Sequence, residues 1–403
     1  MERPLTIAVI AGEESGQLLA ADLIDVIARK HPPGLRLVGV GGSRLRARGL
    51  ETLFDPAEIA LTGVTAVLAR LPRLLMRIRQ TATAIASADP DCLLLIDSPD
   101  FSHRVAKLVK HRRPDLPVIK YVAPTVWAWR PERAAKMRGT IDHVLAVLPF
   151  EPQVMAELGG PPTTYVGHRV TSDPFIAEVR YRRALRAPPA TETPAVLLLP
   201  GSRRSEVRRL APSLGSAAGE LARRNPKARF VVTPAPGVAD MVRDLVAGWP
   251  VKAQVTGQNE EDRIAAWVDA DAALAASGTV LLELAAAGIP CISIYKVDWI
   301  MRRFSGMITA WSGALPNLIT DEPLIPEYYD HTIRPGMLAR RLEQLLTDGP
   351  ARQLQSTGFA RVWDLLSVSE PPADAGARIV LAEIEKRDSA TSKASFDQPA
   401  KLN

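Results

Sequence analysis

The sequence is poor in cysteine, in aromatic residues and in long apolar runs, and each shortage narrows its possible functions. Its 403 residues include two cysteines, Cys92 and Cys291, both within apolar segments, which fits a reducing cytoplasm. No apolar run approaches the roughly 20 residues that span a bilayer. The six histidines are scattered, and Phe, Trp and Tyr make up 5% of the chain, so zinc-finger spacing and basic–aromatic nucleic-acid modules are excluded.

The N-terminus leads directly into an apolar strand pattern and has no signal-peptide pattern, so we expect a cytoplasmic protein. The net charge is +6 and the isoelectric point is near 9.4. Such a surplus suits nucleic acid, anionic lipid or an acidic small substrate. Because no nucleic-acid module is found, we favour lipid or phosphate as the partner and expect no nucleic-acid binding.

The length and the apolar pattern predict an α/β protein of two domains, each with a parallel sheet covered by helices. Apolar runs alternate with helix-like stretches, and a Pro-rich segment at 188–194 interrupts the series. The strands are expected at 5–11, 36–40, 92–96, 118–122, 144–148, 195–199, 229–233, 272–276 and 291–295. The domains are expected at 1–170 and 171–350, followed by C-terminal helices at 351–385 and a polar, disordered tail at 386–403.

Two strand-to-helix turns in the second half predict a diphosphate site. The residues at these turns are Gly201, Ser202, Ser277, Gly278 and Thr279. A turn of this kind directs backbone N–H groups and a helix dipole toward an anion, although small residues also cap helices that bind nothing. Glu283, a lone carboxylate in an apolar helix, would meet a ribose hydroxyl pair, and Arg203 would fork onto phosphate oxygens.

Polar residues at the ends of two strands in the first half predict catalytic and substrate-binding roles. Asp97 follows the expected strand at 92–96, where open α/β sheets bind ligands, and we take it as a general base. The alternative is that Asp97 caps the next helix. After the strand at 118–122, Trp127 and Trp129 are expected to form a substrate wall, with Arg130 facing a phosphate.

The turn after the first strand is assigned to a sugar or an acceptor. Glu13, Ser15 and Gly16 lie there, and its acidic residues would repel a phosphate. Neither this turn nor the glycines at 39–42 give the dinucleotide-binding fingerprint. Asp269 and Asp271 resemble a metal-binding pair but precede a strand, so we read them as a turn and expect no metal.

Residues 59–80 form an amphipathic, basic stretch. Its apolar positions include Val64, Val67, Leu68, Leu71 and Leu75, and its cations are Arg70, Arg73 and Arg77. Such a stretch can lie on a membrane surface with its arginines on anionic headgroups, or pack on the sheet with a solvated basic face. Pro72 interrupts the pattern, which predicts two helices that meet at a bend.

Eight motifs in one order resemble lipid-A-disaccharide synthase over nearly the whole chain. They are Gly12-Glu13-Glu14-Ser15-Gly16, Ile96-Asp97-Ser98-Pro99-Asp100-Phe101, Pro124-Thr125-Val126-Trp127-Ala128-Trp129-Arg130, Leu148-Pro149-Phe150-Glu151, Tyr165-Val166-Gly167-His168, Leu199-Pro200-Gly201-Ser202-Arg203, Ala276-Ser277-Gly278-Thr279 and Leu315-Pro316-Asn317-Leu318. The resemblance implies a glycosyltransferase B fold, in which two Rossmann-like domains face a cleft and C-terminal helices can return to the N-terminal domain.

The resemblance also implies an activity: inverting transfer from UDP-2,3-diacylglucosamine to 2,3-diacylglucosamine 1-phosphate, without a cofactor, giving the β-1,6 disaccharide of lipid A and UDP. The family's important aspartate falls on Asp97, its key arginine on Arg203 and a cleft asparagine on Asn317. In the first turn, Glu14 and Gln17 replace the Thr and Asp that the family usually has, so no charged role is carried over to Gln17.

The family further implies peripheral association with the cytoplasmic face of the inner membrane. It can exchange C-terminal elements between subunits, so a homodimer is an alternative to a monomer. Two other classes of function stay open: another UDP-sugar enzyme of the same fold, either an epimerase or a peptidoglycan glycosyltransferase, and a non-catalytic lipid-binding or nucleic-acid-binding protein.

Overall fold

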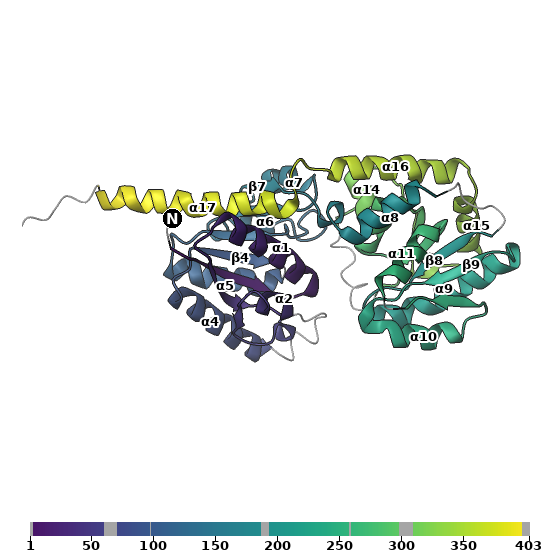
Figure 1. The fold of residues 1–403 in the computed structure, drawn as a ribbon, viewed down its shortest axis with the longest axis horizontal. Coiled ribbons are helices and arrows are strands. Elements are labelled where there is room, and N and C mark those ends of the chain that lie inside the picture. Colours follow the sequence, from purple (N-terminus) through teal and green to yellow (C-terminus); the bar gives the residue numbers. More distant parts are fainter. Residues whose placement is uncertain are drawn as a thin grey trace, which may run out of the picture. The chain divides into compact units, whose positions relative to one another are not determined.

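A computed structural model describes residues 3–59, 71–96, 98–186, 193–257, 259–297 and 309–396, with side chains described to residue 390 (Figure 1). The chain divides into two compact units, which are described separately. Unit 1 comprises Met1–Arg169 and Val368–Asn403, and unit 2 comprises Val170–Ser367. The four-part division expected from the sequence stays a prediction.

Unit 1 is built on a parallel sheet with the strand order β3-β2-β1-β4-β5-β6-β7. Its strands are β1 (Leu5–Ala11), β2 (Leu35–Val40), β3 (Glu51–Thr52), β4 (Cys92–Ile96), β5 (Val118–Tyr121), β6 (His143–Ala146) and β7 (Thr163–Tyr165). Every residue of β1 and β4 is buried, as expected of central strands whose sequences are continuous apolar runs. The five predicted strands are confirmed within one or two residues at each end, whereas the short β3 and β7 were not predicted.

Helices cover both faces of the unit 1 sheet. They are α1 (Glu14–Lys30), α2 (Ser43–Arg46), α4 (Leu71–Ser87), α5 (Pro99–Arg112), α6 (Arg133–Lys136), α7 (Glu151–Glu157) and α17 (Pro372–Phe396). The helices α4 and α5 pack against each other over a core that contains Val144 of β6. Leu145, the next residue along the strand, faces the other way and lies close to Gly376 of α17. One face of the sheet is therefore covered by α4 and α5, and the other by α1 and α17.

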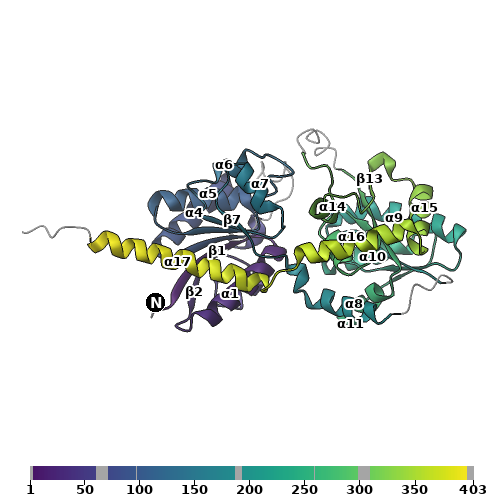
Figure 2. The same cartoon turned by 90° about the horizontal axis from the view of Figure 1, so that it is seen from above.

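The C-terminal helix α17 belongs to unit 1, as the resemblance predicted. It packs against α1, as Figure 2 shows. Arg387 donates a hydrogen bond to the buried carboxylate of Asp91 (3.0 Å), which also accepts from Arg3 and from the backbone N–H of Thr6. Because α17 continues to Phe396, residues 386–396 are helical, which corrects the expected disordered tail over that range.

Unit 2 has a second parallel sheet, with the strand order β10-β9-β8-β11-β12-β13. Its strands are β8 (Ala195–Leu199), β9 (Arg229–Val232), β10 (Ala253–Val255), β11 (Ala272–Ala276), β12 (Cys291–Tyr295) and β13 (Glu327–Tyr329). Its helices are α8 (Pro174–Ala184), α9 (Arg204–Arg224), α10 (Ala239–Ala247), α11 (Glu260–Asp269), α12 (Val280–Ala286), α14 (Leu315–Thr320), α15 (Pro335–Leu346) and α16 (Pro350–Leu366). The four predicted strands are confirmed, and the edge strands β10 and β13 are additional.

In both sheets the order of the strands reverses once, next to the first strand of the unit. In unit 1 the chain runs outward from β1 to β3 and then begins again at β4, on the other side of β1; in unit 2 the same reversal lies between β8 and β11. Open α/β sheets bind ligands at such a reversal, outside the carboxyl ends of the two strands. The topology therefore gives each unit one preferred place for a site.

Candidate active site

A pocket of about 280 Å³ opens at the reversal in unit 2, which is near the lower end of the range for small-molecule sites. We call it the β8–β11 pocket. Six of the residues predicted for the diphosphate site line it together: Gly201, Ser202, Ser277, Gly278, Thr279 and Glu283. Gly201 and Ser202 precede the other four residues by some 80 positions in the sequence, so the fold brings the predicted set together.

The turn between β11 and α12 has fewer free donors than the sequence predicted. The backbone N–H of Ser277 donates to the carbonyl oxygen of Ile294 (3.0 Å) and extends the sheet ladder. Within the described residues, no backbone acceptor is found for the N–H groups of Gly278 and Thr279. These two donors, not three, are available to an anion at the start of α12.

The turn between β8 and α9 is occupied by a side chain of the protein itself. Glu206, in the first turn of α9, accepts a hydrogen bond from the backbone N–H of Ser202 (3.2 Å). A Cβ at Gly201, which has a φ of +104°, would lie 2.2 Å from the Glu206 carboxylate. The turn between β8 and α9 therefore already holds a carboxylate, whereas the turn between β11 and α12 has two free N–H groups among the described residues. Arg203 is the N-cap residue of α9, with an exposed side chain beside the pocket-lining Ser202.

Sequence reasoning missed the residues that form the far wall of the pocket. This wall includes Thr233 and the following turn after β9, together with Arg263 and Trp267 of α11. The guanidinium of Arg263 lies 4.7 Å from the ring centroid of Phe175, and the indole of Trp267 makes an edge-to-face contact with the same ring. The position of Thr233 at the end of a predicted strand was the available signal; α11 carried none.

Asn317 supports the pocket from behind and does not line it. Its side chain is buried, and its amide nitrogen donates to Ser312 Oγ (3.1 Å) and to the carbonyl of Ile325 (3.0 Å), while its oxygen accepts from the N–H of Ile325 (2.8 Å). Ser312 also donates to Glu327. The next residue, Gly313, lies against Ser277, because a Cβ added there would be 3.6 Å from Ser277 Oγ. Asn317 thus holds a loop that packs on the turn between β11 and α12.

The reversal in unit 1 lies between the first turn and the end of β4. Asp97 falls outside the described residues, but its neighbour Ser98 is packed against the first turn: a Cβ at Gly12 would meet Ser98 Oγ at 2.5 Å. Ser98, Val122 and Arg130 all have positive φ angles, of 43°, 69° and 53°. Non-glycine residues in this conformation are strained, and they cluster at functional sites. All three follow β4 or β5 at the carboxyl edge of the sheet.

The first turn presents two of its three predicted residues to solvent. Glu13 and Ser15 are exposed, whereas Gly16 is buried in the first turn of α1. Glu14 is paired with Arg44 (2.9 Å). Gln17 is buried, with its side-chain amide where a Cβ of Gly42 would be, so this departure from the family pattern is a packing residue.

The tryptophan segment is fixed by a buried carboxylate. Trp127 Nε1 donates to Glu151 Oε1 (3.3 Å), and the N–H groups of Val147 and Leu148 donate to Glu151 Oε2. Burial raises the pKa of Glu151 to about 7, although these three donors oppose the shift. Glu151 therefore ties the loops after β5 and β6 together, which fixes one side of the predicted substrate wall.

The rest of the predicted wall is held by contacts within its own segment and by burial. The guanidinium of Arg130 stacks over the Trp129 ring, 4.7 Å from its centroid. The indole N–H of Trp129 is buried, and no hydrogen-bond partner is found for it among the described residues. Trp127 and Trp129 are both half-buried, so part of each side chain is open to a ligand.

The amphipathic stretch is described from Leu71 onward, and Val64, Val67, Leu68 and Arg70 lie outside the described residues. Pro72 lies in α4 next to the first described residue of that helix, Leu71, and the predicted bend between two helices falls outside the described residues. Arg73 and Arg77 both donate to Glu58, and Arg77 also stacks over Phe54. These two arginines therefore share a carboxylate partner within the protein, and their contact with headgroups stays a prediction.

Of the acidic pair at 269 and 271, Asp271 has a structural role in unit 2. Asp271 is buried and pairs with Arg186 (2.8 Å) while accepting from the N–H of Ala195, so it fixes the start of two strands. No cluster of three or more metal-binding side chains is found among the described residues. In the same part of the chain, no helix is long and apolar enough to cross a membrane.

Comparisons with known proteins agree on one family and one fold. The family described as lipid-A-disaccharide synthetase matches residues 7–373. The chain is 42% identical over 385 residues to the lipid-A-disaccharide synthase of Bradyrhizobium diazoefficiens, covering 94% of this chain and 97% of that one. It is 41% identical over 393 residues to the lipid-A-disaccharide synthase of Rhodospirillum centenum, covering 96% of each chain.

Among solved structures, the S. aureus MnaA–UDP complex is similar with a TM-score of 0.58 and 9% identity, covering 99% of this chain and 100% of that one. The UDP-GlcNAc 2-epimerase of Neisseria meningitidis bound to UDP-GlcNAc is similar with a TM-score of 0.56 and 12% identity, covering 95% and 100%. These likenesses identify the two-sheet, glycosyltransferase B-like fold that the sequence predicted.

Proposed function

We propose a catalytic assignment for this chain, which belongs to the lipid-A-disaccharide synthase family and is a glycosyltransferase of lipid A biosynthesis. The donor is UDP-2,3-diacylglucosamine and the acceptor is 2,3-diacylglucosamine 1-phosphate. The observation that carries the assignment is the β8–β11 pocket, in which six residues predicted for the nucleotide converge at the reversal of a parallel sheet.

In this assignment unit 2 holds the UDP part of the donor. Glu283 accepts hydrogen bonds from the ribose hydroxyls, and the N–H groups of Gly278 and Thr279 meet the diphosphate. Arg203, beside the pocket, neutralises the negative charge that grows on UDP as it leaves. The support for these roles is the lining of the pocket, the two unpaired N–H groups and the position of Arg203 next to Ser202.

Unit 1 supplies the acceptor side of the reaction. The acceptor's 6-hydroxyl gives its proton to Asp97 while its oxygen attacks the anomeric carbon of the donor. A new C–O bond forms as the bond from the anomeric carbon to the UDP oxygen breaks, so the configuration inverts and UDP departs. Glu13, Ser15 and Gly16, together with Trp127, Trp129 and Arg130, surround the acceptor. The strained backbone at Ser98, Val122 and Arg130 supports a site at this edge.

The assignment also includes contact with the cytoplasmic face of the inner membrane. Leu71, Leu75 and Met76 of α4 are 36%, 42% and 54% exposed, which is unusual for large apolar side chains on one helix. Leu71→Ser/Leu75→Ser should reduce sedimentation with phospholipid vesicles. Leu185→Ser/Leu354→Ser, which alters two exposed leucines of unit 2, is the matched control. Equal binding by both variants and the parent would contradict the membrane role.

A homodimer formed by exchange of the C-terminal helix α17 is the last part of the proposal. It is tested by light scattering after size-exclusion chromatography over a range of protein concentrations. A monomer at every concentration would contradict it.

The deciding experiment is an assay of UDP release with both lipid substrates in detergent. The proposal requires release only when the acylated acceptor is added, with a disaccharide product. UDP-sugar turnover without an acceptor would favour an epimerase, which the fold of the solved relatives keeps as the second candidate. Release with an unacylated or peptidoglycan-type acceptor alone would favour another glycosyltransferase.

A further inference from the structure

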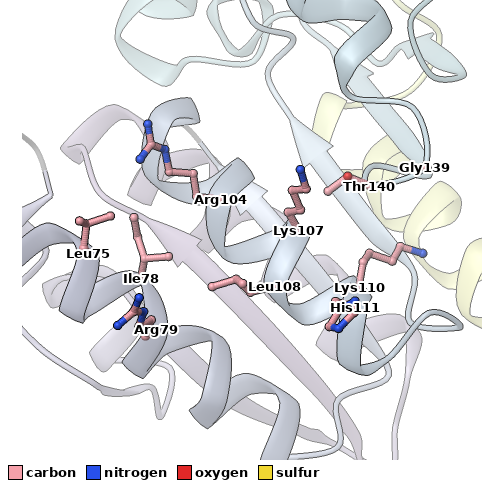
Figure 3. Close-up of a pocket in the computed structure, with 10 residues that line it drawn as sticks. All are labelled: Leu75, Ile78, Arg79, Arg104, Lys107, Leu108, Lys110, His111, Gly139 and Thr140. Atoms are coloured by element: carbon pink, nitrogen blue, oxygen red, sulfur yellow. The ribbon is translucent and has the colours of Figure 1, made fainter.

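A groove of about 600 Å³ runs between α4 and α5 on the face of unit 1 that these helices cover (Figure 3). Leu75, Ile78 and Arg79 line it from α4. Arg104, Lys107, Leu108, Lys110 and His111 line it from α5, and Gly139 and Thr140 close one end. Residues 75 and 79 of α4, and 104, 108 and 111 of α5, recur at helical spacing and form two facing stripes. We call this site the α4–α5 groove.

The groove is basic and has no acidic lining residue. Lys110 is paired with Asp142 at 2.8 Å. Arg79, Arg104 and Lys107 are exposed, and within the described residues none of them has an ion-pair partner. The nearby carboxylate of Asp100 is paired with Arg133 at 2.9 Å, so it does not neutralise the groove. Three cations therefore line the groove without an ion-pair partner among the described residues, which favours an anionic ligand.

The same groove exposes apolar side chains beside its cations. Leu75 is 42% exposed and Leu108 is 37% exposed, and both lie between the charged residues of the two stripes. Leu71 and Met76 extend the apolar surface along α4. A free phosphate or a nucleic acid backbone would gain nothing from these leucines, whereas a lipid presents an anionic headgroup next to its acyl chains.

From this juxtaposition we infer that the α4–α5 groove binds the phosphate headgroup of an anionic phospholipid in the membrane surface. The inference rests on the proposed membrane contact, and it changes which cations are assigned to the lipid headgroups. Arg73 and Arg77, which the sequence pattern assigned to headgroups, are bound to Glu58. The headgroup cations are instead Arg79, Arg104 and Lys107, of which two belong to α5, outside the amphipathic stretch.

The test uses the full chain and vesicles of phosphatidylcholine with or without phosphatidylglycerol. Arg79→Gln/Arg104→Gln/Lys107→Gln should weaken binding to the anionic vesicles by about a hundredfold, since each cation near an anionic surface contributes roughly a factor of five. Binding of the parent should fall as salt is raised, and the variant should have lost most of that salt dependence.

The matched control removes the same charge from exposed sites outside the groove, with Arg29→Gln/Arg36→Gln/Arg46→Gln. It should bind the anionic vesicles within about threefold of the parent, because dispersed charges away from the contact surface act weakly. Both variants change exposed side chains only, and equal melting temperatures verify that each is folded.

The outcomes separate this inference from the proposed function. If the groove variant binds anionic vesicles like the parent while Leu71→Ser/Leu75→Ser does not, the membrane contact stands and the headgroup site is overturned. If soluble glycerophosphate or a DNA duplex displaces the vesicles at low concentration, the groove is a site for free anions or nucleic acid and the inference is also overturned. UDP release in detergent should be the same for the groove variant and the parent, and a large loss would place these cations in the catalytic site.

Discussion

The β8–β11 pocket and the α4–α5 groove both suit anions, but they are lined by different kinds of polar group. The pocket offers backbone N–H groups of Gly278 and Thr279, one guanidinium, Arg263, and two carboxylates, Glu206 and Glu283. The groove offers cationic side chains on two helices and no carboxylate. Backbone donors have fixed positions and directions, whereas long cationic side chains adapt to many ligands.

This difference indicates how each site selects its ligand. Carboxylates in a phosphate pocket would be unfavourable unless part of the ligand consists of hydroxyl groups, so the pocket suits a molecule with both a diphosphate and a sugar. The inferred headgroup site in the groove would discriminate by charge and by contact with apolar chains, which suits a surface of many similar lipids. The two proposed sites would then combine, in one chain, fixed donors at a sheet reversal with adaptable cations on helices.

The largest expected effect separates chemistry from nucleotide binding. Asp97→Asn should lower the turnover number by about 10²–10⁴-fold, as is typical for loss of a general base, and leave UDP affinity unchanged. Asp100→Asn, three residues later and paired with Arg133, is the control and should keep near-parent turnover. The measurements are UDP release and calorimetric titration with UDP. Parent-like turnover of Asp97→Asn would exclude this residue as the base.

The second prediction concerns the buried carboxylate of unit 1. The pKa of Glu151 is raised from its usual value of 4.5 to about 7, so the native state holds its proton more tightly than the unfolded state. The free energy of unfolding should therefore fall as pH rises from about 4.5 to 7, by about 3 kcal/mol relative to Glu151→Gln, which has no such proton. Thermal unfolding of both proteins across this range tests the sign. Parallel pH profiles would show that Glu151 titrates normally.

A third prediction asks whether Asn317 touches the ligand or supports the pocket. Asn317→Ala leaves the Ser312 and Ile325 groups without their partner and should lower the free energy of unfolding by about 2–3 kcal/mol. Gln254→Ala, at an exposed position on β10, should cost less than about 0.5 kcal/mol. Urea unfolding measures both, and UDP affinity should fall together with stability. Weaker UDP binding at unchanged stability would make Asn317 a direct ligand.

Much of the fold and part of the site could be predicted from the sequence because both depend on local patterns. The central strands β1, β4, β8 and β11 are continuous apolar runs that end in small or polar residues, so their positions and the turns after them were predictable. The edge strands β3, β7, β10 and β13 have two or three residues each and mixed polarity. Only pairing with a neighbouring strand identifies such segments.

The features that the sequence did not reveal depend on contacts between distant segments. Glu58 captures Arg73 and Arg77 across 15 and 19 positions, which no helical periodicity indicates. Arg263 reaches the β8–β11 pocket from a helix whose sequence shows only amphipathicity. Glu206 was closer to being predictable, because an acidic residue in the first turn of a helix is favoured by the helix dipole. Its contact with the turn between β8 and α9 required the structure.

The smallest expected effect compares the two carboxylates of the pocket. Glu283→Gln should weaken UDP binding by about tenfold, because an amide replaces a charged acceptor of ribose hydroxyls. Glu206→Gln should leave UDP affinity unchanged or raise it up to about threefold: the amide oxygen still accepts from the Ser202 N–H, while a negative charge near the diphosphate is removed. Calorimetry with UDP measures both. Equal losses of affinity in the two variants would mean that Glu206 also binds hydroxyl groups of the nucleotide. The turn between β8 and α9 would then contact the sugar and not the phosphates.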